Sequence, residues 1–284
     1  MRNATIYCLC LHDKVLPIMK NLGYVPVGLG NNKFSKEWTK DNTFENISPK
    51  NKYYSEYTFH YWFWKNILPK IEDNHWIGFC AYRDYWSKKK EISNDPNFKF
   101  NEEKVPNVIR VDNIRVEDLV ITEIPNEWEN FDTIVGAHHY MNSLKFSKLL
   151  KHGIWSLIRN PSALFKSKRN IRFHFDMWHG NGNLDRAIDL LDDNDRENFR
   201  KYTRKNISIS RGNMFVCRSK KIMNDYYNSL FPWLERCEKI FGFNFGSYGN
   251  MRIFAFLAER YQSYWFEEYT KPLFWPVIFY DISK

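Results

Sequence analysis

The sequence predicts an α/β protein in which buried strands carry polar groups at their ends. His75–Trp86 begins as a short apolar run and changes abruptly to Tyr82-Arg83-Asp84-Tyr85, and Ala4–Leu11 is a similar run that ends in His12-Asp13-Lys14. A helical pattern precedes His75–Trp86, the order found in half of a βαβ unit. Ligands of open α/β sheets bind beyond the carboxyl ends of such buried strands. His75–Trp86 therefore indicates a ligand site or, equally, a strand that runs into a solvated turn.

The 284 residues are enough for one large domain, and we expect a single domain over 1–284. Aromatic residues make up 18% of the chain and are expected mainly in the core. No apolar run approaches the ~20 residues that cross a bilayer. The five cysteines fit neither a zinc site nor a disulfide framework, so we expect buried, reduced thiols in a cytoplasmic protein. They are Cys8, Cys10, Cys80, Cys217 and Cys237.

The N-terminal half alternates between strands, loops and one clear helix. Tyr24–Val27 is predicted as a short strand. Tyr53–Leu68 has the apolar spacing of an amphipathic helix, with Glu56 and His60 on an adjoining face. Further on, edge strands are predicted at Val108–Val111 and Leu119–Ile124.

A buried strand at Asp132–Ala137 ends in His138-His139. Adjacent residues of a strand point to opposite faces, which argues against a two-histidine metal site there. Lys88-Lys89-Lys90 is interpreted as solvated.

The segment Leu144–Arg172 is basic and amphipathic, and it contains no acidic residue. Basic residues alternate with apolar and aromatic ones, a composition typical of segments that lie on an anionic membrane surface. A pair of solvated basic helices that cover a core is the alternative. We treat 144–172 as an insertion and keep a membrane-facing position as one of its two interpretations.

The C-terminal half is predicted to be mainly helical. His174, Asp176 and His179 lack a convincing metal-ligand spacing. Leu184–Tyr202 is predicted as a helix with Asp189–Asp195 on its solvated face. Strands are expected at Ile207–Ile209 and Asn213–Cys217.

Three further elements complete the C-terminal half. Ser219 is predicted to cap a helix that Pro232 interrupts. Asn250–Phe266 is a strong helix with Arg252, Phe256 and Glu259 on one face. The aromatic tail Pro272–Tyr280 is expected to pack back on the domain.

The formal charge of +9 favours an anionic partner. Nucleic acid, anionic lipid and a phosphorylated substrate all remain open, although no nucleic-acid-binding signature accompanies the charge. Phosphate-loop, dinucleotide, zinc-protease and nucleophile-elbow motifs are absent. Mixed polar groups at strand ends suit a diphosphate-bearing ligand, held by Arg or Lys and stacked on aromatic rings.

Several segments together resemble one bacterial family, the domain-of-unknown-function 4422 glycosyltransferases of capsule and exopolysaccharide loci. The clearest is Ile77-Gly78-Phe79-Cys80-Ala81-Tyr82-Arg83-Asp84-Tyr85-Trp86, supported by Lys50–Glu56 and Tyr61–Asn66 before it. Asn213-Met214-Phe215 and Arg252 with Phe256–Arg260 extend the resemblance over most of the chain.

The resemblance implies a GT-A-like (Rossmann-like) fold with a mixed central sheet flanked by helices. It implies transfer of a sugar from a nucleotide donor, expected to be a UDP-sugar, to a lipid-linked or polysaccharide acceptor of the capsule or cell surface. Some family members handle galactofuranose, and other hexose donors are equally open. The family usually has His-Tyr-Arg-Arg-Tyr where this chain has Ala81-Tyr82-Arg83-Asp84-Tyr85. The change to Asp84 makes this residue a candidate ligand of a divalent Mn or Mg ion or, alternatively, of a sugar.

On this hypothesis a carboxylate deprotonates the acceptor hydroxyl and cations stabilise the departing diphosphate. The base candidates are Asp185 and Glu259, although a helix ion pair with Arg252 or Arg260 explains Glu259 equally well. The donor-binding candidates are His12, Lys52, Glu56, His60, Tyr82, Arg83, Asp84, Arg252 and Arg260. The acceptor-binding candidates are His138, His139, His179 and Asn213.

The competing hypothesis is a non-catalytic basic module that binds a membrane or nucleic acid. For the enzyme, we expect a cytoplasmic protein, possibly peripheral on the inner face of the cytoplasmic membrane, with no nucleic-acid partner. The donor sugar, the acceptor and the linkage are open at this stage.

Overall fold

The fold is organised around one mixed sheet. The computed structural model describes residues 4–88, 90, 99–100, 108–111, 118–143, 146–243, 246 and 248–280. Strand β1 (Ala4–Cys10) pairs in parallel with β2 (Val25–Gly28) and β4 (Trp76–Ala81). On the far side of β4 the antiparallel strand β11 (Phe215–Cys217) follows. The predicted strands at Ala4–Leu11 and Tyr24–Val27 are thereby confirmed within a residue or two at their ends, and the first half of His75–Trp86 is confirmed as β4.

The remaining strands extend this sheet on both sides. Parallel to β2 lies β3 (Thr39–Lys40), and beyond β11 lie β8 (Thr133–Gly136) and then β12 (Pro272–Trp275). A further group is formed by β5 (Asp84–Trp86), β13 (Val277–Tyr280), β7 (Val108–Val111) and β6 (Lys99–Phe100). The aromatic tail therefore packs back as predicted, and it does so by supplying two strands of the sheet.

Both faces of the sheet are covered, which explains why its central strands β1 and β4 are mainly apolar. Along β1, Tyr7 and Leu9 enter the core on one face, whereas Ile6 and Cys8 enter the core on the other. All five cysteines are buried and free, as expected. No helix in the described part of the chain is both long enough and apolar enough to cross a membrane.

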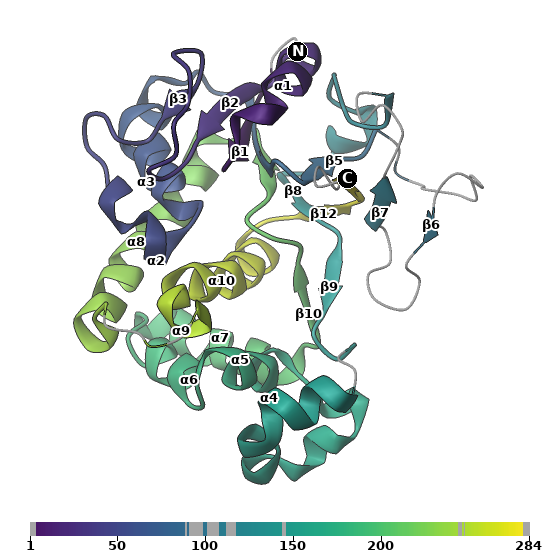
Figure 1. Cartoon of the computed structure of the whole chain (residues 1–284), viewed down its shortest axis with the longest axis vertical. Helices are drawn as coiled ribbons and strands as arrows, with labels where there is room; N and C mark the ends of the chain where they lie inside the picture. The colour runs from purple at the N-terminus through teal and green to yellow at the C-terminus, as the bar shows by residue number, and fades with distance from the viewer. Residues whose placement is uncertain are drawn as a thin grey trace.

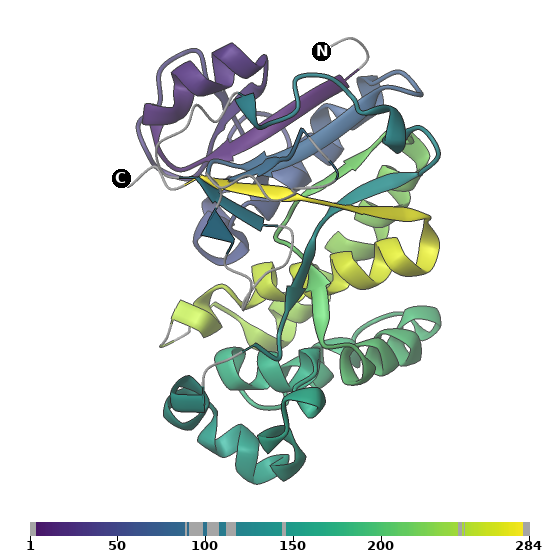
Figure 2. The same ribbon diagram turned by 90° about the vertical axis from the view of Figure 1, so that its right-hand side faces the viewer.

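The helices form two groups (Figure 1). Around the sheet lie α1 (Leu16–Leu22), α2 (Asn51–Tyr54), α3 (Tyr57–Asn66), α8 (Lys220–Phe241) and α10 (Ile253–Tyr269), and the short helix α9 (Tyr248–Met251) precedes α10 and contacts α5. At the end of the molecule away from β1 and β2 lie α4 (Phe146–Arg159), α5 (Ile171–His179), α6 (Asn183–Ile188) and α7 (Asp193–Lys205). A two-stranded ribbon, β9 (His138–Tyr140) with β10 (Ser208–Ser210), connects the sheet to this second group (Figure 2).

Two predicted continuous elements are divided in the structure. His75–Trp86 is a strand, a two-residue turn at Tyr82-Arg83 and a returning strand, because Ala81 pairs with Asp84. The helix predicted over Tyr53–Leu68 is broken between α2 and α3 at Ser55, where φ is 53°. Both breaks fall where candidate site residues lie.

The ends of two C-terminal helices and the length of a third also depend on contacts that the local sequence pattern does not show. The helix predicted over Leu184–Tyr202 breaks between α6 and α7, where Arg236 and Arg196 donate to the carbonyls of Leu190 and Leu191. Within α8 the helix runs straight through Pro232, since burial of its apolar face outweighs one lost hydrogen bond. Ser219 does cap α8, accepting from the amide of Ile222.

Leu119–Ile124 is not a strand. It contributes only an isolated bridge, from Val120 to Ser87. Part of the predicted irregular segment 87–107, including Lys89, and the residues Leu144 and Lys145 lie outside the described residues.

Candidate active site

Two cavities lie next to each other, the first of them at the carboxyl ends of β1 and β4. The first, here called the strand-end cavity, has a volume of about 200 Å³ and is lined by Leu9 and Ala81 from those strand ends. The second, here called the histidine cavity, has a volume of about 750 Å³ and lies beside α5, α10 and the β9–β10 ribbon. The residues that line both cavities are Asp84, Gly212, Phe256 and Glu259. The two cavities therefore form one continuous candidate site.

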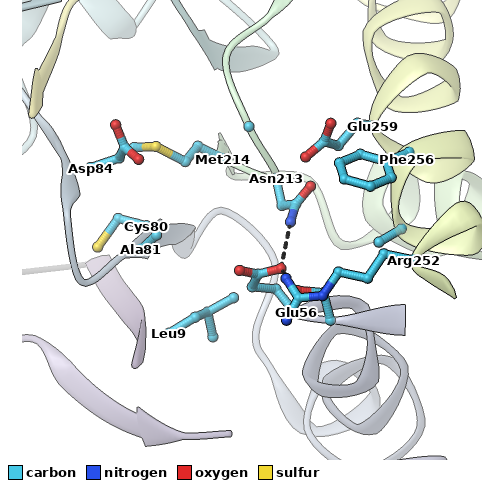
Figure 3. Close-up of a pocket in the computed structure, with 13 residues that line it drawn as sticks. Leu9, Glu56, Cys80, Ala81, Asp84, Asn213, Met214, Arg252, Phe256 and Glu259 are labelled. Carbon is cyan, nitrogen blue, oxygen red and sulfur yellow. Dashed lines mark hydrogen bonds between the residues drawn. The ribbon is translucent and has the colours of Figure 1, made fainter. Parts of the chain in front are cut away.

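The strand-end cavity is lined by a connected polar cluster (Figure 3). Asn213 donates through Nδ2 to Glu56 Oε2 at 3.0 Å, and Glu56 also accepts from the hydroxyl of Ser55. Arg252, at the N-terminal end of α10, donates to Ser55 Oγ at 3.3 Å. Ser55 is held in its left-handed conformation while Asn51 donates to its carbonyl at 2.9 Å. Backbone strain of this kind collects at functional sites, where the surrounding structure imposes it.

Asp84 lies between the cavities and is bound by an arginine that sequence reasoning missed. Arg211, in the turn before β11, approaches Asp84 Oδ1 at 2.8 Å through both Nε and Nη2. Among the described residues no group of three His, Cys, Asp or Glu side chains could hold a metal ion. Asp84 has one oxygen taken by a guanidinium, so the described residues do not by themselves form a resident site for Mg²⁺ or Mn²⁺. Such an ion is usually held by one or two carboxylates together with substrate phosphates, so a metal ion at Asp84 would need the phosphates of a bound donor as further ligands.

Glu259, like Asp84, is a carboxylate that lines both cavities. It comes from α10, where periodicity placed it on one face with Arg252 and Phe256, and all three line the strand-end cavity. Arg260 Nη1 lies 2.7 Å from Glu259 Oε2. Burial raises the pKa of Glu259, and the negative charge of Glu56 adds to that increase, whereas Arg260 and Arg252 oppose it. A carboxylate with a raised pKa in a cleft is suited to accept a proton.

The histidine cavity contains three imidazoles held neutral by burial. Burial lowers the pKa of His139 to about 4 and that of His179 to about 3, and lowers that of His174 well below its usual value; nearby Arg260 adds to all three shifts. Nδ1 of His179 donates to the carbonyl of Gly249 at 3.0 Å, so its Nε2 is left as an acceptor. The ring of His179 stacks on Phe256 with centroids 4.0 Å apart.

Several buried polar atoms in the joined cavities have no hydrogen-bond partner among the described residues. They are Asn213 Oδ1, His139 Nδ1, His174 Nδ1 and Arg260 Nε. Buried polar atoms in native proteins are almost always paired, so a cluster of exceptions in one cavity indicates a place for a polar ligand.

A second cation and two rings lie at the turn that follows β4. Arg83 lies over the ring of Tyr82, with its guanidinium carbon 5.0 Å from the centroid. Tyr82 in turn contacts His12, which follows β1, edge to face at 5.5 Å. The structure thus brings His12, Tyr82 and Arg83 together at the strand ends, although none of them lines either cavity.

Other candidates are placed away from both cavities. His60 is fully buried, its Nδ1 is 2.9 Å from the hydroxyl of Tyr227, and burial lowers its pKa to about 3. Asp185 is held by three arginines, Arg172, Arg200 and Arg204, which makes it an ion-pair centre of the second helix group.

His138 stacks on Phe274 with centroids 3.9 Å apart, and Lys52 is exposed on α2 beside Tyr53. These two residues, like His60 and Asp185, do not line the site. Their predicted roles in donor binding, acceptor binding or catalysis gain no support from this geometry.

Arg211, Ser55 and Trp178 are the important residues that sequence reasoning did not select. The only available signal for Arg211 was a cation in the Ser210-Arg211-Gly212 turn between two strands. Trp178 lines the histidine cavity from α5 and packs against His152 of α4, with centroids 4.9 Å apart.

Comparison with known proteins supports the fold. The family model described as "Domain of unknown function (DUF4422)" matches residues 6–271. No curated protein matches the chain. A solved structure titled "WbbM bifunctional glycosytransferase apo structure" is similar over 98% of this chain, with a TM-score of 0.67 and 20% sequence identity. The match covers 45% of that larger chain, so this chain spans less than half of its length. The mixed α/β, GT-A-like fold predicted from the sequence is confirmed.

Proposed function

The chain belongs to the DUF4422 family, and on that premise we propose that it transfers a sugar from a nucleotide-sugar donor to a hydroxyl group of a glycan acceptor. The observation that carries the proposal is the position of Glu259, a carboxylate with a raised pKa between a small polar cavity at the strand ends and a larger cavity lined by histidines. The structural similarity to a glycosyltransferase is consistent with this function.

The donor is proposed to bind at the strand ends. Ligands of open α/β sheets bind there, and Arg252 at the N-terminal end of the 17-residue helix α10 offers a cation where the helix dipole is positive. Arg83 offers a second cation beside the rings of Tyr82 and His12, which suit stacking on a base. We propose UDP as the nucleotide and a hexose as the sugar, in keeping with the family resemblance.

The acceptor is proposed to bind in the histidine cavity. Neutral imidazoles both donate and accept hydrogen bonds, which matches the hydroxyl groups of a sugar. The rings of Trp178 and Phe256 provide apolar surfaces for the faces of a sugar ring. The acceptor would be a surface polysaccharide or its lipid-linked precursor.

The chemistry is proposed to be a direct displacement. An acceptor oxygen forms a bond to the anomeric carbon while the bond from that carbon to the diphosphate oxygen breaks. The proton of the acceptor hydroxyl passes to Glu259, and arginine side chains stabilise the charge of the departing diphosphate. No step is routed through a metal ion, because the described residues do not by themselves hold one.

Donor binding can be tested by thermal shift with UDP, other nucleoside diphosphates and a panel of nucleotide sugars, followed by assays of donor hydrolysis. UDP and one UDP-sugar should raise the melting temperature, and that donor should be hydrolysed slowly without acceptor. Absence of both effects would contradict the proposal. Steep, salt-dependent binding of nucleic acid in their place would support the non-catalytic alternative.

The role of Glu259 can be tested by Glu259→Gln, which keeps the shape of the side chain and removes the base. Turnover should fall by a factor of about 10² to 10⁴ with the UDP-dependent thermal shift retained. Glu197→Gln, on the exposed surface of α7, is the control and should leave turnover and the thermal shift unchanged. Turnover that survives Glu259→Gln would remove Glu259 as the base.

The role of Asp84 is tested with Asp84→Asn and with a metal chelator. We expect the chelator to leave turnover of the wild-type protein unchanged, while Asp84→Asn lowers it by loosening the Arg211 contact. A wild-type activity that requires Mn²⁺ or Mg²⁺ and loses that requirement in Asp84→Asn would restore Asp84 as a metal ligand.

A further inference from the structure

Exposed apolar side chains are concentrated in one region of the molecule. Ten large hydrophobic side chains are exposed among the described residues, and seven of them lie within 146–165. Those seven, here called the apolar ridge, are Phe146, Leu150, Ile154, Trp155, Ile158, Leu164 and Phe165. Monomeric proteins rarely gather so many exposed apolar side chains without a partner.

The ridge is formed by helix α4 and the short helix η6 (Pro161–Leu164) that follows it. Phe146, Leu150, Ile154 and Ile158 recur every four residues and so run along one side of α4, and Trp155 adjoins them with 69% of its surface exposed. Leu149, Gly153 and Leu157, on the adjoining side of α4, are buried. Both ribbon views place α4 at the end of the molecule remote from β1 and β2 (Figures 1 and 2).

The turn after α4 is held firmly, so Leu164 and Phe165 are presented by a fixed structure. Arg169 is buried, and its guanidinium donates to the carbonyls of Ala163 and Leu164 at 2.9 and 3.1 Å. Phe165 is 70% exposed beside them. An arginine that braces the backbone beneath two exposed apolar side chains is an arrangement that favours contact with another surface.

A polar, basic cavity lies next to the ridge. It has a volume of about 480 Å³ and is lined by Asn160, Ser162, Ser167, Lys168, Asn170, Arg172, Arg204 and Lys205. Four of these side chains are cationic and none is acidic. Asp185 neutralises part of the charge by pairing with Arg172 and Arg204, at 2.8 and 3.2 Å, so a net positive charge remains. A phosphate group is the anion that such hydroxyl, amide and cationic donors would bind.

We propose that this end of the molecule docks on an anionic lipid bilayer, with the apolar ridge inserted among the lipids and a headgroup phosphate in the basic cavity. The absence of any acid from 144–172 favours a membrane over a protein partner. Helix α4 also contributes His152 to the histidine cavity, so docking places that cavity near the membrane. This link to a lipid-linked acceptor rests on the proposed function, whereas the docking itself does not.

The proposal is tested by flotation of the full chain with vesicles of phosphatidylcholine alone or mixed with phosphatidylglycerol. The protein should float with the anionic vesicles and remain behind with the neutral ones. The double variant Trp155→Ser, Ile158→Ser should lose about tenfold or more in vesicle affinity. Phe44→Ser is the matched control, because Phe44 is exposed but lies outside the ridge. Equal loss in this control, or no flotation of the wild type, would overturn the proposal.

The basic cavity is tested separately by Lys168→Glu with Lys205→Glu. This variant should bind anionic vesicles about tenfold or more weakly. Lys14→Glu with Lys36→Glu makes the same change in net charge at exposed positions outside 144–172 and should have a smaller effect. If both variants lost the same vesicle affinity, the effect would come from net charge alone. That result would contradict a headgroup site in the cavity.

Two further readouts make the result decisive. Donor hydrolysis in solution should be unchanged in the ridge variants, so failed docking and failed glycosyl transfer are distinguished. If the ridge instead joins two copies of the chain, the wild type should be a dimer in solution and should not bind vesicles. The double variant Trp155→Ser, Ile158→Ser should then abolish the dimer. That outcome would also overturn membrane docking. Phe165→Ser repeats the test should the double variant be less stable.

Discussion

At Ser55 the backbone takes a conformation that a residue with a side chain rarely adopts. Ser55 has a φ of 53° and lies directly before Glu56. Its hydroxyl contacts both Glu56 and Arg252. Ser55→Ala keeps the strain and removes the hydroxyl, whereas Ser55→Gly removes both. We expect Ser55→Gly to unfold with a free energy about 1 kcal/mol higher than Ser55→Ala. Both variants should transfer sugar more slowly than the wild type. Denaturant titrations measure the first effect, and equal stabilities would contradict the assignment of strain.

Asp195 differs from the other aspartates of its acidic run because it is buried. The run Asp189–Asp195 was interpreted as a solvated helix face, yet Asp195 is buried and accepts from the hydroxyls of Tyr261, Tyr264 and Tyr269. That interpretation is wrong for Asp195. These bonds join α7 to α10, the helix that carries Glu259.

Asp195→Ala leaves three tyrosine hydroxyls without their acceptor and should cost about 3 kcal/mol of unfolding free energy or more. Asp189→Ala is the matched control. Asp189 is exposed and pairs only with Arg200 in the described structure, at 2.6 Å, so its loss should cost less than about 1 kcal/mol. Similar costs in chemical denaturation would show that the tyrosine contacts contribute little.

At the scale of elements, the sequence indicated those features that depend on local periodicity. The strands were visible as apolar runs, and the face of α10 with Arg252, Phe256 and Glu259 followed from helical spacing. Contacts between distant segments were not visible. Asp84 and Arg211 are 127 positions apart, and nothing in the local pattern of either indicates the other. Helical spacing likewise placed His60 on a helix, but it did not indicate the contact with Tyr227, which lies 167 positions away.

The close contact between β8 and the turn before β11 offers a test of how that turn is positioned. A Cβ atom on Gly136 would lie 2.8 Å from the carbonyl oxygen of Arg211, which is backbone and cannot rotate away. Gly136→Ala should therefore displace the turn that carries Arg211 and Asn213. We expect a loss of about 1 to 3 kcal/mol in stability and a fall in turnover.

Gly246→Ala is the control for this substitution, since nothing lies within 4 Å of a Cβ added there. It should leave stability and turnover close to those of the wild type. A Gly136→Ala variant with full activity would mean that the turn is not positioned by β8.

At the scale of the whole molecule, the site exists because the chain brings together groups from its two ends. The strand-end cavity takes Leu9 and Ala81 from the N-terminal part and Asn213, Arg252 and Glu259 from the C-terminal part. The last strands, β12 and β13, follow α10 and return into the same sheet, where they pair with β8 and β5. The general position of the site at strand ends could be predicted because topology fixes it. Its second cavity could not, because it depends on how the β9–β10 ribbon and α5 pack together.

Burial of neutral histidines makes the stability of the whole molecule depend on pH. His60, His139 and His179 have pKa values lowered to about 3 to 4 in the folded state, against about 6.5 when exposed. Between these values the unfolded chain binds more protons than the folded one. The unfolding free energy should therefore fall as the pH drops below about 6.5. Buried carboxyl groups whose pKa is raised, such as Glu259, act in the opposite direction.

A difference measurement on His60 isolates one contribution, because His60 lies outside the site. His60→Gln should be less stable than the wild type at pH 7, since it disturbs the packing and the Tyr227 contact. Its deficit should shrink by up to about 1.4 kcal/mol per pH unit below pH 6.5, because the variant no longer loses stability to protonation of that imidazole. His12→Gln, which removes an exposed imidazole, is the control. A deficit for His60→Gln that stays constant from pH 7 to pH 5 in denaturant titrations would show that the buried imidazole is not linked to unfolding.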